Sequence, residues 1–165
     1  MAYEELVRRH QTVALRAAAL IAGADAPDAV QEAFVKAYAA LGRFQADASF
    51  RPWLLRIVAN EARNARRAVG RRGNLAVRLA AERGPGDAAP SPEATLLDHE
   101  DKQALYGALL RLGERDRLVL GYRFLIGLSE RETAAALDIR PGTVKSRTAR
   151  ALGRLRVLFF EEASS

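Results

Sequence analysis

The sequence contains no cysteine, two histidines, and no hydrophobic run long enough to cross a membrane. Without cysteine the chain has no disulfide, no thiolate metal ligand and no catalytic thiol, and this composition is typical of a reducing compartment. His10 and His99 are far apart in sequence and lack metal-ligand spacing, so we expect neither a metal nor a cofactor. A membrane-spanning helix needs about 20 mostly apolar residues. We therefore expect a cytoplasmic protein with no membrane insertion.

The chain of 165 residues carries more positive than negative charge. The 26 lysines and arginines outnumber the 20 aspartates and glutamates, giving a net charge of +6 and an isoelectric point near 10.3. A balance of this sign favours a polyanionic partner such as nucleic acid. Hydrophobic residues make up 49% of the chain, which is typical of a folded protein and argues against disorder of the whole.

Helical periodicity runs through almost the whole sequence, and no strand alternation accompanies it. The first half contains three apolar stripes at helical spacing. Gly42 should end the second helix, and Ser49 can cap a third that runs to about Arg67. The stripes consist of Leu6, Val13, Ala17, Leu20 and Ile21, then Val30, Phe34, Ala37 and Leu41, then Trp53, Leu54, Ile57 and Val58.

Composition changes between the two halves. Glycine, proline and alanine dominate from Gly84 to Pro92, which predicts a flexible linker over residues 73–92. A helix start at Ser91 should then lead to a helix ending near Leu112, followed by another from Arg115 to Phe124. The expected fold is therefore all-α, with two small helical domains (1–72 and 93–165) joined by the linker.

The stretch from Gly127 to Arg150 is typical of a helix-turn-helix, in which the second helix enters the DNA major groove. Ser129 and Glu132 have capping-box spacing, and Asp138 falls in the tight turn, where a positive φ is expected. Ile139, Val144, Thr148, Leu152 and Leu155 should form the inner stripe of this segment. The expected outer face carries hydroxyl and basic side chains and no acid, and its bases are Arg140, Lys145, Arg147, Arg150, Arg154 and Arg156.

The first half contains three further features of interest. Aromatic residues between Phe34 and Trp53 alternate with bases, so they could stack unpaired nucleotides or form core, with Phe34 and Trp53 expected to be the most buried. Asn60 and Asn64 lie on one helical face among arginines, where asparagine can read a base edge. The acidic and polar residues Asp25, Asp28, Gln31 and Glu32 suit a helix N-terminus or a docking surface for a basic protein.

These segments together resemble two conserved regions of bacterial sigma factors. Asp25 to Tyr38 and Phe50 to Asn60 resemble region 2. The resemblance to region 4 lies in three other segments of this chain, Leu112 to Arg115, Gly127 to Ser129 and Gly142 to Arg147. With these two regions and no others, the chain resembles the extracytoplasmic-function group.

The resemblance implies a non-enzymatic initiation factor that binds core RNA polymerase, through the β′ clamp helices and the β flap, and promoter DNA, both duplex and melted. It also implies an anti-sigma partner. Docking on polymerase would use Asp28, Gln31, Glu32 and Lys36. The −10 element would meet Arg56, Asn60, Asn64, Arg67 and Arg71. The −35 element would be read by Arg140, Thr143, Lys145, Ser146, Arg147 and Arg150.

The alternative is a stand-alone helix-turn-helix transcriptional regulator, which would bind a palindromic site as a dimer without polymerase. That alternative gives no role to the acidic helix or to the aromatic residues. A nucleic-acid enzyme is a third class, and the sequence has no nucleotide loop, metal cluster or nucleophile-base pair to support it.

Overall fold

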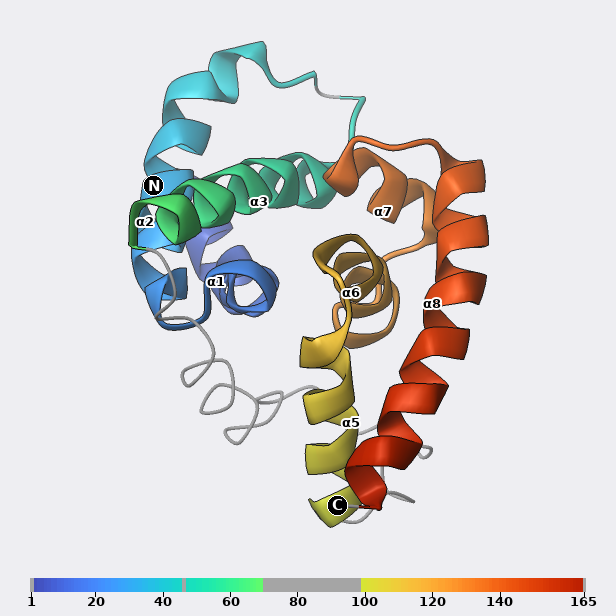
Figure 1. Ribbon diagram of the computed structural model, residues 1–165. Coiled ribbons are helices and arrows are strands. Elements are labelled where there is room, and N and C mark those ends of the chain that lie inside the picture. Colours follow the sequence, from blue (N-terminus) through green and yellow to red (C-terminus); the bar gives the residue numbers. More distant parts are fainter. Residues whose placement is uncertain (1, 46, 70–98, 165) are drawn as a thin grey trace.

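The computed structural model describes residues 2–45, 47–69 and 99–164, and these ranges contain helices and turns with no strand (Figure 1). The all-α prediction is therefore confirmed. The predicted linker and the helix start at Ser91 lie outside the described residues. The described α-helices are α1 (Ala2–Ala22), α2 (Ala26–Ala40), α3 (Phe50–Val69), α5 (His99–Arg111), α6 (Glu114–Leu120), α7 (Glu130–Leu137) and α8 (Pro141–Ala163).

The N-terminal domain is a bundle of α1, α2 and α3, which all pack against one another. Alanines line the contacts and have no exposed surface, among them Ala14, Ala17, Ala33 and Ala37. Because a methyl group occupies little space, the helix axes can approach closely, while Leu54, Leu55 and Val58 of α3 fill the centre. Helix α2 ends at Ala40, and Gly42 lies in the following 3₁₀ turn η2 (Leu41–Arg43), as predicted.

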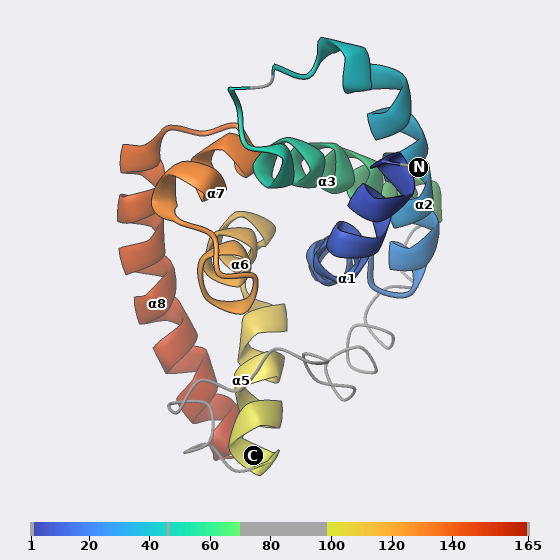
Figure 2. The same ribbon diagram turned by 180° about the vertical axis from the view of Figure 1, so that it is seen from behind.

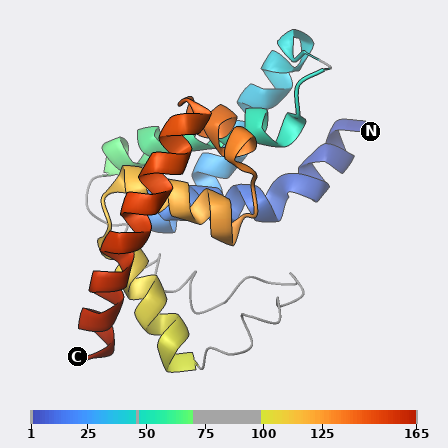
Figure 3. The same ribbon diagram turned by 90° about the vertical axis from the view of Figure 1, so that its right-hand side faces the viewer.

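The C-terminal domain packs α8 along α5, α6 and α7 (Figure 3). Leu118, Val119, Leu128 and Val144 are almost completely buried between these helices. The predicted helix from Arg115 to Phe124 is present as α6 followed by a π-helical turn, η4 (Gly121–Leu125). No helix in the described ranges is both long and apolar enough to cross a membrane.

The two domains are in direct contact. Helix α3 lies against α7, and α1 lies against α6 and η4, as the front and back views show (Figures 1 and 2). Most buried apolar residues of both domains form one continuous cluster. At Gly121 the Leu20 side chain packs directly against the glycine, since a Cβ added there would collide with Cδ1 of Leu20. The sequence predicted two domains on a tether and did not predict this contact.

Candidate nucleic-acid and polymerase interfaces

The helix-turn-helix consists of α7, a tight turn and α8, and its local geometry follows from three residues. The Ser129 hydroxyl accepts a hydrogen bond from the Glu132 backbone N–H at 3.1 Å, and the Glu132 carboxylate accepts one from the Ser129 N–H at 3.0 Å. Asp138 has φ 57° and ψ 47°, the left-handed conformation that a short polar residue tolerates. The predicted capping box and turn are both confirmed.

The N-terminal turns of α8 present a polar and basic surface. Lys145, Ser146 and Arg150 are exposed, as is Arg140 just before the helix, whereas Thr143 and Arg147 are half-buried. The Ser146 hydroxyl donates to the Thr143 carbonyl at 3.3 Å, and Arg150 Nε donates to the Ser146 carbonyl at 3.4 Å. All six predicted −35 residues lie between Arg140 and Arg150. The fully buried Val144 anchors this stretch to the core.

Two residues further along α8 differ from the prediction. Arg154 does not belong to a free basic face, because its guanidinium forms an ion pair with the Asp116 carboxylate of α6. Leu152 does not belong to the inner stripe, since 43% of its surface is exposed. Ala151 is fully buried in its place, and the inner stripe continues through the partly buried Leu155 and Leu158.

The predicted −10 residues lie along α3. Asn60, Asn64 and Arg67 are exposed, and Arg71 lies outside the described residues. Arg56 is also exposed, but its Nη2 is 3.0 Å from Oδ2 of Asp138 in the helix-turn-helix turn. Further along α3, two other arginines contact the Glu114 carboxylate. Arg63 Nε lies 3.6 Å from its Oε2, and Arg66 Nη1 lies 2.7 Å from its Oε1. The asparagines therefore face solvent, and three arginines of α3 face the C-terminal domain.

The predicted docking residues Asp28, Gln31, Glu32 and Lys36 are all exposed on α2. Lys36 also forms an ion pair inside the domain, with Glu61 of α3. Its Nζ is 2.5 Å from Oε1 of Glu61 on α3, and this hydrogen bond raises the Lys36 pKa. Glu61 is buried, so the pair ties α2 to α3 and satisfies a carboxylate that would otherwise be unpaired.

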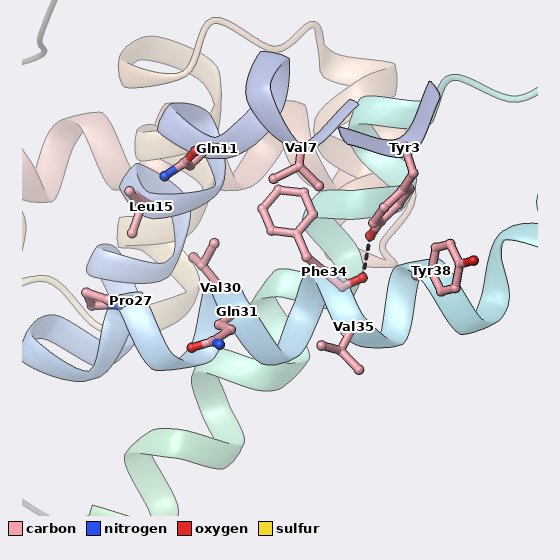
Figure 4. Close-up of a pocket in the computed structure, with 10 residues that line it drawn as sticks. All are labelled: Tyr3, Val7, Gln11, Leu15, Pro27, Val30, Gln31, Phe34, Val35 and Tyr38. Atoms are coloured by element: carbon pink, nitrogen blue, oxygen red, sulfur yellow. Dashed lines mark hydrogen bonds between the residues drawn. The ribbon is translucent and has the colours of Figure 1, made fainter. Parts of the chain in front are cut away.

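An apolar groove of about 580 Å³ lies between α1 and α2, next to the docking residues (Figure 4). Its lining includes Val7, Leu15, Val30 and Phe34, with Gln31 at one edge. The ring of Tyr38 stacks edge-on against Tyr3 at 5.0 Å, and the Tyr3 hydroxyl donates to the Phe34 carbonyl. Sequence reasoning missed this groove, although the apolar Val35 lies among the polar residues of α2 and signals it.

The aromatic residues of the N-terminal domain lie in two places, at the apolar groove and in a separate ring cluster around Trp53. Phe34 is buried as predicted, whereas Trp53 is half-buried and is less enclosed than we expected. Trp53 forms a cluster with Phe44 and Phe50, with ring centroids 5.0 to 5.7 Å apart. Tyr38 is 65% exposed at the groove. Part of the aromatic surface therefore remains accessible.

Residues 3–72 match the family model for sigma-70 region 2, and residues 102–155 match the one for sigma-70 region 4. The ECF RNA polymerase sigma-E factor of Escherichia coli K12 is 39% identical over 157 residues, which cover 91% of this chain and 82% of that protein. The RNA polymerase sigma-H factor of Pseudomonas aeruginosa is 40% identical over 133 residues, which cover 77% of this chain and 69% of that protein.

Two solved structures resemble the whole arrangement. CnrH in complex with the cytosolic domain of CnrY has a TM-score of 0.69 and 32% identity, and covers 97% of this chain and 88% of that one. The sigma factor RpoE of Bartonella quintana, in complex with the anti-sigma factor NepR, has a TM-score of 0.68 and 26% identity. The match covers 95% of this chain and 96% of that one. This chain therefore belongs to the sigma-70 family, and within it to the extracytoplasmic-function RNA polymerase sigma factors.

Proposed function

We propose that this chain binds core RNA polymerase and directs transcription initiation by recognising the −35 and −10 promoter elements and assisting strand opening. The observation that carries the proposal is the presence of regions 2 and 4, in that order, in one chain with an exposed reading helix and an exposed polar face on α3. Such a factor requires no catalytic side chain, because capture of unpaired bases shifts the equilibrium towards open DNA.

The C-terminal domain is proposed to read the −35 element with α8 in the major groove. Exposed Lys145, Ser146 and Arg150 reach base edges, and Arg140 contacts the phosphate backbone together with the free amides at the start of the helix. Thr143 and Arg147 are half-buried beside these residues and belong to the same DNA-binding surface. The same domain is proposed to contact the polymerase β flap.

The N-terminal domain is proposed to hold the −10 element on α3. Asn60 and Asn64 are one turn apart and exposed, so both amides can bind the edges of bases that have left the duplex. Arg56, Arg67 and Arg71 supply positive charge for the phosphates. The half-buried Trp53 cluster offers ring surface on which an unpaired base can stack.

Polymerase docking is proposed to involve the exposed face of α2. Asp28 and Glu32 provide negative charge, and the groove with Val35 and Tyr38 at its side provides apolar contact area. An acidic edge beside an apolar groove suits an amphipathic helix with basic residues, such as the β′ clamp helices. Lys36 is assigned a smaller role at this surface because Glu61 already engages it.

Reversal of one charge on this face tests the docking assignment. Glu32→Lys is expected to weaken binding to core polymerase about tenfold, since the lysine repels a basic partner. Glu4→Lys makes the same charge change at another exposed acid, on α1, and serves as the matched control. The measurement is competition with a labelled sigma factor for core polymerase, combined with thermal unfolding of both variants. Equal affinities for the two variants would contradict the assignment.

An anti-sigma protein is a further proposed partner, because two structural relatives were solved with CnrY and with the anti-sigma factor NepR respectively. The stand-alone regulator is not favoured. It would bind a palindromic site as a dimer in the absence of polymerase, and it gives no function to the groove and acidic edge of α2.

A further inference from the structure

Lys36 lies near two carboxylates that belong to different parts of the N-terminal domain. Asp28, Glu32 and Lys36 follow one another at intervals of four residues, so they form one line along the exposed side of α2. The hydrogen bond with Glu61 is the main cause of the raised Lys36 pKa, and the charge of Glu32 adds to it. The lysine therefore pairs with a buried acid of α3 although an exposed acid of the docking surface lies close by.

Burial explains why Glu61 is the preferred partner. Its side chain is only 9% exposed, so water solvates the carboxylate poorly and a cation must compensate the charge. Among the ion pairs of the described residues, Lys36 is the cation at Glu61. Glu32 is exposed and well solvated, and a surface pair four residues apart gains little. Lys36 is therefore held against α3, and the Glu32 carboxylate is left uncovered.

We propose that Glu61 is a positioning residue for polymerase docking, because it holds Lys36 against α3 and so keeps the Glu32 carboxylate available to a basic partner. This inference rests on the proposed docking role of α2. Without the Glu61 charge, Lys36 turns along α2 to Glu32 and covers that acid. Glu61 is itself buried in the domain, so it acts through Lys36 and needs no contact with polymerase.

The charge balance of the docking surface makes the position of this one lysine important. The line along α2 has two exposed acids, Asp28 and Glu32, and Lys36 is the cation at its end. If Lys36 covers Glu32, the surface presents one uncompensated acid to a basic partner in place of two. That partner must then displace the lysine before it can bind, which lowers its affinity.

Two variants remove the Glu61 charge. Glu61→Gln does so at nearly constant volume, so the packing of α2 against α3 should be preserved. Glu61→Leu places an apolar side chain in the same buried site, where it is well tolerated, and it serves if the glutamine variant unfolds. Glu4→Gln is the matched control, since it makes the same charge change at an exposed acid of α1. Urea unfolding shows that each variant is folded.

The position of Lys36 is measured first, by NMR of isotope-labelled lysine in the free chain without polymerase. The only lysines of the sequence are Lys36, Lys102 and Lys145, so their side-chain signals are readily assigned. In the natural chain and in the control, the Lys36 side chain should show its strongest nuclear Overhauser effects to Glu61. In both test variants the strongest ones should be to Glu32. A Lys36 side chain that stays on α3, or that points into water without contact to Glu32, would overturn the inference.

Affinity for core polymerase is measured second, as a double-mutant cycle of Glu61→Gln with Glu32→Gln. With Glu32 present, Glu61→Gln should weaken binding about threefold, the scale of an exposed ion pair. In the Glu32→Gln background the same change should have little effect, because no carboxylate remains at that position for Lys36 to cover.

The cycle separates positioning of Lys36 from support of the fold. An unchanged affinity with Glu32 present, or an equal loss in both backgrounds, would overturn the inference, since a purely structural role of Glu61 does not depend on Glu32. Failure of the natural chain to bind core polymerase would contradict the proposed function instead, and it would leave the NMR result unaffected.

Discussion

Arg150→Ala is expected to lower transcription from a −35-dependent promoter by roughly tenfold or more, because a two-point contact between arginine and guanine contributes about 1–3 kcal/mol. Arg150 is exposed on the third turn of α8, and its hydrogen bond within the described part of the chain is a long one of 3.4 Å to the Ser146 carbonyl. Its removal should therefore leave the fold intact. Binding should lose both affinity and discrimination at one base pair of the element.

The measurement is run-off transcription from promoters that carry the native or a mutated −35 element. Arg115→Ala is the matched control, since Arg115 is equally exposed but lies on α6, outside the helix-turn-helix. The control should transcribe like the natural chain. If Arg150→Ala reduced transcription from the native and mutated elements by the same factor, the reading role of this residue would be wrong.

Arg154→Ala, one turn further along α8, is expected to affect stability instead. The change leaves the Asp116 carboxylate without its cation, and that side chain is only 11% exposed. Loss of one partner from a fully buried pair costs about 3–5 kcal/mol. Because the Arg154 side chain is 60% exposed, solvent reduces this, and we expect a loss of about 2 kcal/mol in the free energy of unfolding.

Urea unfolding measures this effect. The midpoint should fall by about 1 M for Arg154→Ala, given a typical slope of 1–3 kcal/mol per molar urea. The double variant Asp116→Ala/Arg154→Ala should recover part of the loss, because no unpaired carboxylate then remains in the partly buried site. Equal stability of Arg150→Ala and Arg154→Ala would refute the different roles assigned to the two arginines.

The features that could be predicted from the sequence are those set by neighbours along the chain. Ser129 and Glu132 are three residues apart, which is sufficient to define a capping box. Asp138 follows the helix directly, where only a few residue types tolerate a positive φ. Asn60 and Asn64 share one face by helical spacing alone. All three predictions describe a single helix or turn, and the structure agrees with each.

The features that could not be predicted depend on which helices meet. Periodicity shows that α8 has an apolar face, but the close approach of its neighbours selects Ala151 for the core and leaves Leu152 at the surface. The pairing of Arg154 with Asp116 joins residues 38 positions apart, and local charge pattern cannot reveal it. The contact of α3 with α7 crosses the segment between the domains, so no short-range signal indicates it.

Run-off transcription with core polymerase, in the presence and absence of this chain, tests the central claim most directly. We expect core polymerase alone to start without specificity. With the chain added, transcripts should begin at one position downstream of a matched −35 and −10 pair, and the −10 region should become reactive to permanganate as it opens. If the chain neither bound core polymerase nor changed the start sites, the assignment as an initiation factor would be contradicted.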